Sequence, residues 1–129
     1  MSEWTSDELS KIGAAEEVQI TSRRRDGTLR KPVTVWVVRD GDNLYARSVT
    51  GPSGAWFRGV QDSHEGRIRA GGIEKDVTFV VDANDGSAEK VDAAYRAKYR
   101  RYPGGILNSV LTPQARSATV KLVPPSTRS

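Results

Sequence analysis

Residues 30–58 read RKPVTVWVVRDGDNLYARSVTGPSGAWFR, and this stretch decides the fold. It predicts a strand over residues 30–39, a turn over 40–43 and a second strand over 44–49. The first strand carries Val33, Val35 and Val37 on one face and Thr34, Trp36 and Val38 on the other. A strand that is largely apolar on both faces is buried on both sides, as in a closed barrel or a packed sheet.

The rest of the chain predicts short strands, hairpins and one long helix. Thr5 and Glu8 form a capping box that begins a short N-terminal helix ending near Gly13. Further strands are expected over residues 17–24, 66–70, 74–82 and 119–123, and an Asp26-Gly27 turn follows the first of these. A helix is expected from Ser87 to about 102, where Pro103-Gly104-Gly105 stops it, and a helical turn near 112–113. Residues 56–60 fit either a short strand or the start of a helix.

These elements predict an α+β domain. We expect a small, mostly antiparallel split β-barrel with about six strands, a short N-terminal helix and one main helix in the C-terminal half. The 129 residues suit a single domain over residues 1–125, followed by a disordered tail over 126–129.

Composition excludes several classes of site. The chain has no cysteine and one histidine, His64, so thiol catalysis and sites that need two imidazoles are excluded. An enzyme of this composition would take its chemistry from an organic cofactor. We find neither a membrane-crossing apolar run nor a secretion signal, and therefore expect a cytoplasmic protein with no membrane partner. The net charge of +4 is more often a solvation feature than a nucleic-acid footprint.

One loop combines charge, hydroxyls and backbone amides. Arg47 and Ser48 end the second quoted strand, and the loop from Gly51 to Gly54 follows. Free amides there, together with Arg47, could receive an anion. Alternatively, Arg47 forms a structural ion pair with Asp40, Asp42 or Glu65.

The hairpin and this loop resemble a known superfamily. The opening hairpin of deazaflavin-dependent nitroreductase-like proteins is similar to residues 21–27, TSRRRDG, followed by Arg30 and Pro32. The Ser-x-x-Gly loop and the tryptophan of those proteins are similar to Ser48, Gly51, Gly54 and Trp56. The resemblance covers roughly residues 17–82. It implies the flavin split barrel, which is shared with pyridoxamine phosphate oxidases. Over nearly its whole length, the chain resembles a bacterial family catalogued as a domain of unknown function (family two-two-five-five), through tracts such as LYARSVTGP and HEGRIRAGG.

The superfamily resemblance implies a cofactor, FMN or a deazaflavin (F420), and a homodimer with the site at its interface. Taken together, the residue patterns and this resemblance give nine candidate contacts: Arg47, Ser48, Gly51, Gly54, Trp56, Arg58, Arg24, Arg30 and Lys98. The chain departs from the pattern where the superfamily has its first hairpin glycine and its hydroxyl, because Arg23 and Asp26 stand there. A carboxylate at the hydroxyl position would repel a phosphate.

Each candidate also has a purely structural interpretation. Arg24, Arg25 and Arg30 either face a cofactor groove or lie on a solvated hairpin tip. Trp36 and Trp56 either flank a planar ring or fill the core, and His64 is either a general acid or an exposed loop residue. A helix face with Tyr95, Tyr99 and Tyr102 either closes a pocket, with Lys98 reaching an anion, or packs the helix on the barrel.

Three functions remain open on these grounds. The protein is a flavin- or deazaflavin-binding reductase, a non-catalytic module for a small anionic ligand, or a weak nucleic-acid binder. We expect Arg47→Ala to weaken cofactor binding more than Arg25→Ala does.

Overall fold

A computed structural model describes residues 4–49, 51, 54–81, 88–102 and 104–124. Its centre is a sheet of seven antiparallel strands in the order β2-β1-β5-β6-β7-β4-β3. The strands are β1 (Val18–Ser22), β2 (Val33–Val35), β3 (Val38–Asp40), β4 (Asn43–Arg47), β5 (Glu65–Ala70), β6 (Ile73–Val81) and β7 (Thr119–Val123). The α+β split barrel is confirmed, with seven described strands rather than about six.

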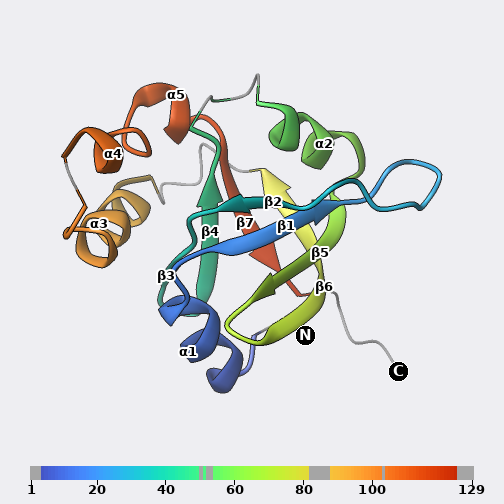
Figure 1. Cartoon of the computed structure of the whole chain (residues 1–129), viewed down its shortest axis with the longest axis horizontal. Helices are drawn as coiled ribbons and strands as arrows, with labels where there is room; N and C mark the ends of the chain where they lie inside the picture. The colour runs from blue at the N-terminus through green and yellow to red at the C-terminus, as the bar shows by residue number, and fades with distance from the viewer. Residues whose placement is uncertain (1–3, 50, 52–53, 82–87, 103, 125–129) are drawn as a thin grey trace.

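The described residues form five helices around the sheet: α1 (Ser6–Ala14), α2 (Ala55–Ser63), α3 (Ala88–Lys98), α4 (Gly104–Asn108) and α5 (Pro113–Arg116). Figure 1 shows α3, α4 and α5 together on one side of the sheet. Helix α2 lies beside the β1–β2 hairpin, and α1 lies at the end of the molecule opposite α2. The Thr5–Glu8 capping box and the Thr112 cap of α5 are confirmed. Residues 56–60 lie within helix α2, and α4 begins at Gly104, where the sequence predicted only a stop.

The single strand predicted over residues 30–39 is wrong. It is divided into β2 and β3, which are the two outermost strands of the sheet. Only Trp36 and Val37 lie between Val35 and Val38, so the two sheet edges are about 10 Å of chain apart. The sheet must therefore curl until its edges meet, and we call the two-residue link at Trp36–Val37 the seam.

Burial on the two sides of the seam differs. Val37 and Val38 are fully buried, as a strand apolar on both faces predicts, whereas the three residues of β2 are half-buried or exposed. Val37 packs into the main core with residues of α1, α2 and the sheet. Val38 packs into a second cluster with Tyr45, Val91, Tyr95 and Tyr99.

The end of α3 satisfies the backbone polar groups at the seam. The Tyr99 hydroxyl accepts a hydrogen bond from the Val37 N–H at 3.2 Å and donates to the Glu16 carbonyl at 2.7 Å. The Lys98 ammonium donates to the Val37 carbonyl at 2.6 Å. The Trp36 ring stacks on Tyr99, with ring centroids 3.9 Å apart and an interplanar angle of 4°. Helix packing, rather than pocket closure, is therefore the role of Tyr99.

Removing the Tyr99 hydroxyl should destabilise the protein. Tyr99→Phe leaves the Val37 N–H buried without its acceptor, which costs roughly 1–3 kcal/mol of unfolding free energy. The matched control is Tyr102→Phe, whose half-buried ring has no hydroxyl bond in the described part of the chain and should change stability by about 0.5 kcal/mol or less. Urea unfolding measures both. Equal stability of the two variants would contradict the role of Tyr99.

The same tyrosines predict loss of stability at alkaline pH. Burial raises the pKa of both Tyr95 and Tyr99 far above the ordinary value of 10.0. A raised folded-state pKa contributes stability that is present below the unfolded-state pKa and is lost as pH rises above about 10. Tyrosinate absorbance and circular dichroism should show two tyrosines that ionise only as the chain unfolds. Ionisation of all tyrosines before unfolding would contradict this expectation.

Candidate functional site

Two neighbouring clefts run along β2. The first, which we call the tryptophan cleft, has a volume of about 290 Å³ and is lined by Glu17, Thr34, Val35, Trp36, Arg47, Val49, Trp56, Ser109 and Val110. The second, the basic cleft, has a volume of about 280 Å³ and is lined by Ile20, Ser22, Arg24, Arg30, Lys31, Val33, Ala55 and Trp56. Trp56 lines both, so the structure brings Trp36, Trp56 and the hairpin cations to one continuous surface.

Trp56 is held at this position by the core. Its half-buried ring packs against the main hydrophobic cluster and meets Phe57 edge-on, with centroids 6.2 Å apart and an interplanar angle of 85°. Phe57 is 1% exposed and anchors the first turn of α2. Both sequence interpretations of Trp56 therefore apply, because the residue packs on the core and lines a cleft. The same is true of Trp36, which stacks on Tyr99 and lines the tryptophan cleft.

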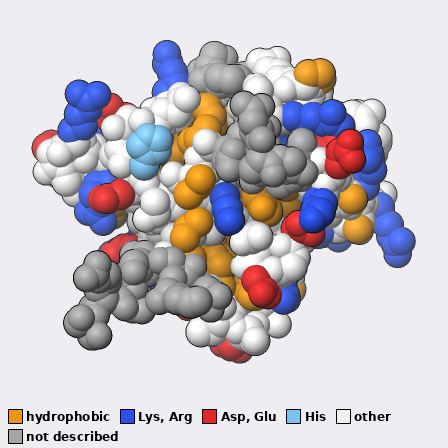
Figure 2. Space-filling view, turned by 180° about the vertical axis from the view of Figure 1, so that it is seen from behind, with side chains coloured by type: hydrophobic (Ala, Val, Ile, Leu, Met, Phe, Trp, Pro, Cys, Tyr) orange, Lys and Arg blue, Asp and Glu red, His pale blue; other side chains and the backbone are white. Residues whose placement is uncertain are grey.

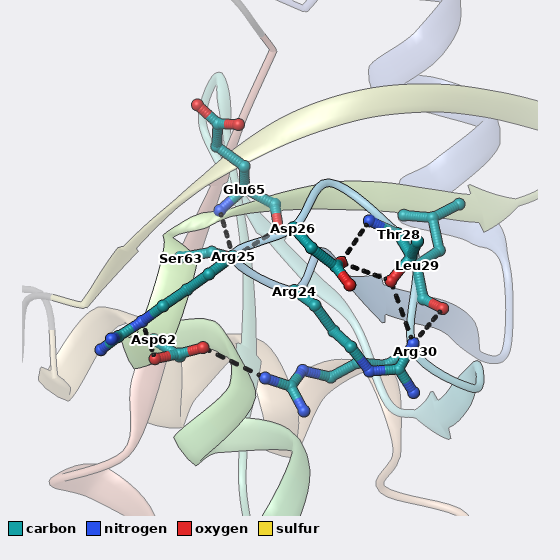
Figure 3. Close-up of polar contacts among 9 residues, drawn as sticks. All are labelled: Arg24, Arg25, Asp26, Thr28, Leu29, Arg30, Asp62, Ser63 and Glu65. Carbon is teal, nitrogen blue, oxygen red and sulfur yellow. Dashed lines mark hydrogen bonds and ion pairs between the residues drawn. The ribbon is translucent and has the colours of Figure 1, made fainter.

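The hairpin arginines are ordered by local contacts, and the expectation of a solvated tip is only partly right. Asp62 of α2 accepts from Arg25 Nε at 2.8 Å and from Arg30 Nη2 at 3.2 Å, so it ties the tip to the helix (Figure 3). Arg24 donates to the Leu29 carbonyl at 3.1 Å. Arg25 is 82% exposed, whereas Arg30 is half-buried and lines the basic cleft with Arg24.

Asp26 is turned into the hairpin tip. Its Oδ1 accepts from the Thr28 backbone N–H at 3.0 Å and from the Thr28 hydroxyl at 2.7 Å (Figure 3). These hydrogen bonds, the hydroxyl one first, lower the pKa of the Asp26 carboxyl. Asp26 does not line the basic cleft, so its carboxylate is not placed to repel an anion there.

Arg47 is part of a buried ion network. Its guanidinium pairs with Asp92 of α3 and donates to Thr119 Oγ1 and to the Val110 carbonyl, each at 2.9 Å. Asp92 also pairs with Arg116. The expected structural ion pair is present, but its partner is none of Asp40, Asp42 and Glu65. Asp92 lies three residues before Tyr95, on the apolar face of α3. A carboxylate on an apolar helix face needs a buried cationic partner, and this feature of the sequence could have identified Asp92 as the partner of Arg47.

Two amides that the sequence analysis expected to be free, those of Gly51 and Gly54, are bonded within the loop. Gly51 N–H donates to the Ser48 carbonyl at 3.0 Å, and Gly54 N–H donates to the Gly51 carbonyl at 3.1 Å. Gly51 has φ +74°, and a Cβ there would lie 2.3 Å from Gln114 Cγ, so the position requires glycine. Ser48 is 1% exposed, and neither it nor the two glycines lines either cleft. For Gly51 and Gly54 the expectation of free amides is wrong, whereas residues 50, 52 and 53 of the loop lie outside the described residues.

The remaining candidates lie outside both clefts. Lys98 donates to the seam, and desolvation lowers its pKa to about 8. Arg58 is exposed on α2. His64 is also exposed; it ends α2 in a left-handed conformation with φ 60°, and its carbonyl accepts from Phe79 N–H. Sequence reasoning missed Lys31, Thr34 and Glu17 as lining residues, although Lys31 and Thr34 stand in the stretch that decides the fold.

Comparison with known proteins identifies the family. Residues 8–122 match a family of uncharacterised proteins conserved in bacteria, DUF2255. The chain belongs to this family. No curated protein matches it. Among solved structures, it is similar to an F420 reductase, with 17% sequence identity, coverage of 93% of each chain and a TM-score of 0.47.

Two classes of structure are not found within the described residues of this DUF2255 member. No helix there is long and apolar enough to span a membrane. No group of three or more acidic or histidine side chains could hold a metal ion.

Loss of the Arg47 side chain should lower the free energy of unfolding. Arg47→Ala removes the fully buried partner of Asp92 and should cost about 3 kcal/mol of unfolding free energy. The matched control is Arg116→Ala, since the Arg116 side chain is 43% exposed on the same carboxylate and its loss should cost about 1 kcal/mol or less. Urea unfolding compares them. An Arg47→Ala variant with wild-type stability would show that Arg47 is not a structural residue.

Proposed function

We propose that this protein binds a flavin or deazaflavin along β2, with the ring in the tryptophan cleft and the anionic tail in the basic cleft. One observation carries the proposal: an aromatic cleft and a cleft lined by three cations adjoin at the shared Trp56. A planar ring with a phosphate tail needs both kinds of surface next to each other.

The residues present fit such a ligand. Ligand pockets commonly measure about 300–1,000 Å³, and the two clefts together fall within this range. Arg24, Arg30 and Lys31 line the basic cleft; no carboxylate is among its described lining residues, and Asp62, which pairs with Arg30, lies outside the lining. Arg30 Nε is buried and has no hydrogen-bond partner in the described structure, so one polar atom at this end is left unsatisfied.

A bound flavin or deazaflavin would supply redox chemistry through its ring. The chain's own part in this proposal is to bind and orient the ligand. Trp36 and Trp56 offer the ring an apolar, aromatic site, and the basic cleft compensates the charge of the tail.

A second candidate function is a binding module without catalysis. The observation that favours it is that Arg47, Lys98 and the backbone amides of Gly51 and Gly54 are engaged in holding the fold. A weak nucleic-acid binder is less well supported. On the face in Figure 2, Lys and Arg side chains are scattered, several of them beside acidic ones, and do not form one basic stripe.

Titration with FMN and riboflavin tests the proposed function. Wild-type protein should quench the fluorescence of both flavins and should bind FMN more tightly, because riboflavin lacks the phosphate. Lys31→Glu should reduce the FMN preference by roughly three- to tenfold, as expected for a partly solvated charge contact. A parallel titration with F420 decides between a flavin and a deazaflavin. To separate a reductase from a binding module, the bound cofactor is reduced by a chemical donor and its turnover is then measured.

Lys90→Glu is the matched control. Lys90 is exposed on α3, does not line either cleft, and its substitution changes the net charge by the same amount. It should leave the FMN preference unchanged. If neither flavin nor F420 binds wild-type protein, the proposal is wrong, and equal effects of the two variants would remove the basic cleft from the site.

The homodimer stays a prediction. Val49 is 51% exposed and lines the tryptophan cleft, so a second copy seated over the cleft would bury an exposed apolar side chain. Sedimentation equilibrium at micromolar concentration checks it, and a monomer mass alone would contradict it.

A further inference from the structure

The β1–β2 ladder contains a one-residue bulge. Near the hairpin tip, Ser22 pairs with Arg30, whose N–H donates to the Ser22 carbonyl at 2.9 Å. Further along, Ile20 pairs with Val33. One residue of β1 therefore faces two residues of the partner, Lys31 and Pro32. Proline fits this position because it has no N–H for the ladder.

The bulge decides which backbone groups of β2 face outward. Arg23 N–H bonds to Glu65 of β5, so the odd residues of β1 point to β5 and the even ones to β2. After the bulge, Val33 pairs with Ile20 and Val35 pairs with Val18. Both partners are even-numbered residues of β1, so Val33 and Val35 direct their peptide groups toward β1. In an antiparallel ladder, the intervening residue turns both its N–H and its C=O to the other side. Thr34 therefore directs one donor and one acceptor away from β1, at the outer edge of the sheet.

Thr34 is also a lining residue of the tryptophan cleft, between Trp36 on one side and the basic cleft on the other. The N–H and C=O of one extended residue point the same way, side by side. Their complement is a ligand edge that carries a carbonyl next to an N–H. Such an edge is a lactam or imide, and it lies in the plane of a ring.

We propose that the backbone edge of Thr34 selects the ring of the ligand by its imide edge, through two hydrogen bonds of the kind that a neighbouring strand would make. This inference rests on the proposed function, and it adds a specificity determinant that is independent of the tryptophans and the cations. Rings of similar size that lack a lactam or imide edge are bound more weakly.

The experiment uses lumiflavin, which has the imide but no tail, and 3-methyllumiflavin, in which the imide N–H is replaced by a methyl group. Wild-type protein should bind 3-methyllumiflavin about tenfold more weakly. The methyl group removes the donor to the Thr34 carbonyl, and its bulk holds the neighbouring ligand carbonyl away from the Thr34 N–H, so two modest hydrogen bonds are lost. This comparison uses the natural chain, so it does not depend on how a variant folds.

Thr34→Pro removes the outward N–H without touching a ladder bond, because proline is tolerated on an edge strand where its nitrogen faces outward. Thr34→Val is the matched control, which alters the side chain and keeps the N–H. Relative to this control, Thr34→Pro should bind lumiflavin about three- to tenfold more weakly. The penalty for methylation should fall to about threefold, since only the carbonyl bond is left to lose. Melting curves check that both variants fold.

The outcomes separate the two proposals. If wild-type protein binds lumiflavin and 3-methyllumiflavin equally, or if Thr34→Pro weakens both by the same factor, the edge does not read the imide and this inference is overturned, while flavin binding stands. If FMN, F420 and lumiflavin all fail to bind wild-type protein, the proposed function fails and this inference fails with it.

Discussion

The structure depends on one hydroxyl at the place where the curled sheet meets itself. Tyr99 receives the Val37 N–H and donates to the Glu16 carbonyl, while Lys98 donates to the Val37 carbonyl. The seam is the point where the chain leaves one edge strand and enters the other, so its peptide groups cannot join either ladder. Buried peptide groups without partners cost free energy, and α3 supplies the partners. The Trp36 ring stacks on Tyr99 and also lines the tryptophan cleft, so it connects these hydrogen bonds to the wall of the cleft.

The buried arginine shows how charge is divided between fold and function. Arg47 ends a strand, as an anion-binding residue would, but the fold surrounds it with Asp92, Thr119 and Val110. These partners join β4 to α3, β7 and the segment before α5, which are far apart in sequence. The cations that line the basic cleft are less buried and come from the hairpin, where Asp62 holds Arg30 on α2. The deeply buried Arg47 therefore has a structural role, whereas the less buried cations of the hairpin line a surface that is open to a ligand.

The bulge and the seam together shape the proposed site. The bulge at Lys31–Pro32 sets which peptide groups of β2 face outward, and the seam ends β2 after three residues. Helix α2 contributes Trp56 to both clefts along this strand. The sheet edge is thereby left open along a groove with an aromatic and a basic half. An open edge strand is ordinarily a hazard, and a ligand that pairs with it would also cover it.

Local chemistry in the sequence determined much of this protein: the capping box at Thr5, the Asp26-Gly27 hairpin, the strands β5, β6 and β7, and the helix that carries Tyr95 and ends just before Tyr99. Each depends on residues within a few positions of one another, so periodicity and capping rules reach them. The resemblance to split barrels supplied the architecture. Only the tertiary structure decided that residues 30–39 form two opposite edge strands, that Asp92 is the partner of Arg47, and that Trp36, Trp56 and the hairpin cations share one groove. Those facts follow from how the seven-stranded sheet curls, and curvature brings together residues whose separation along the chain carries no local signal.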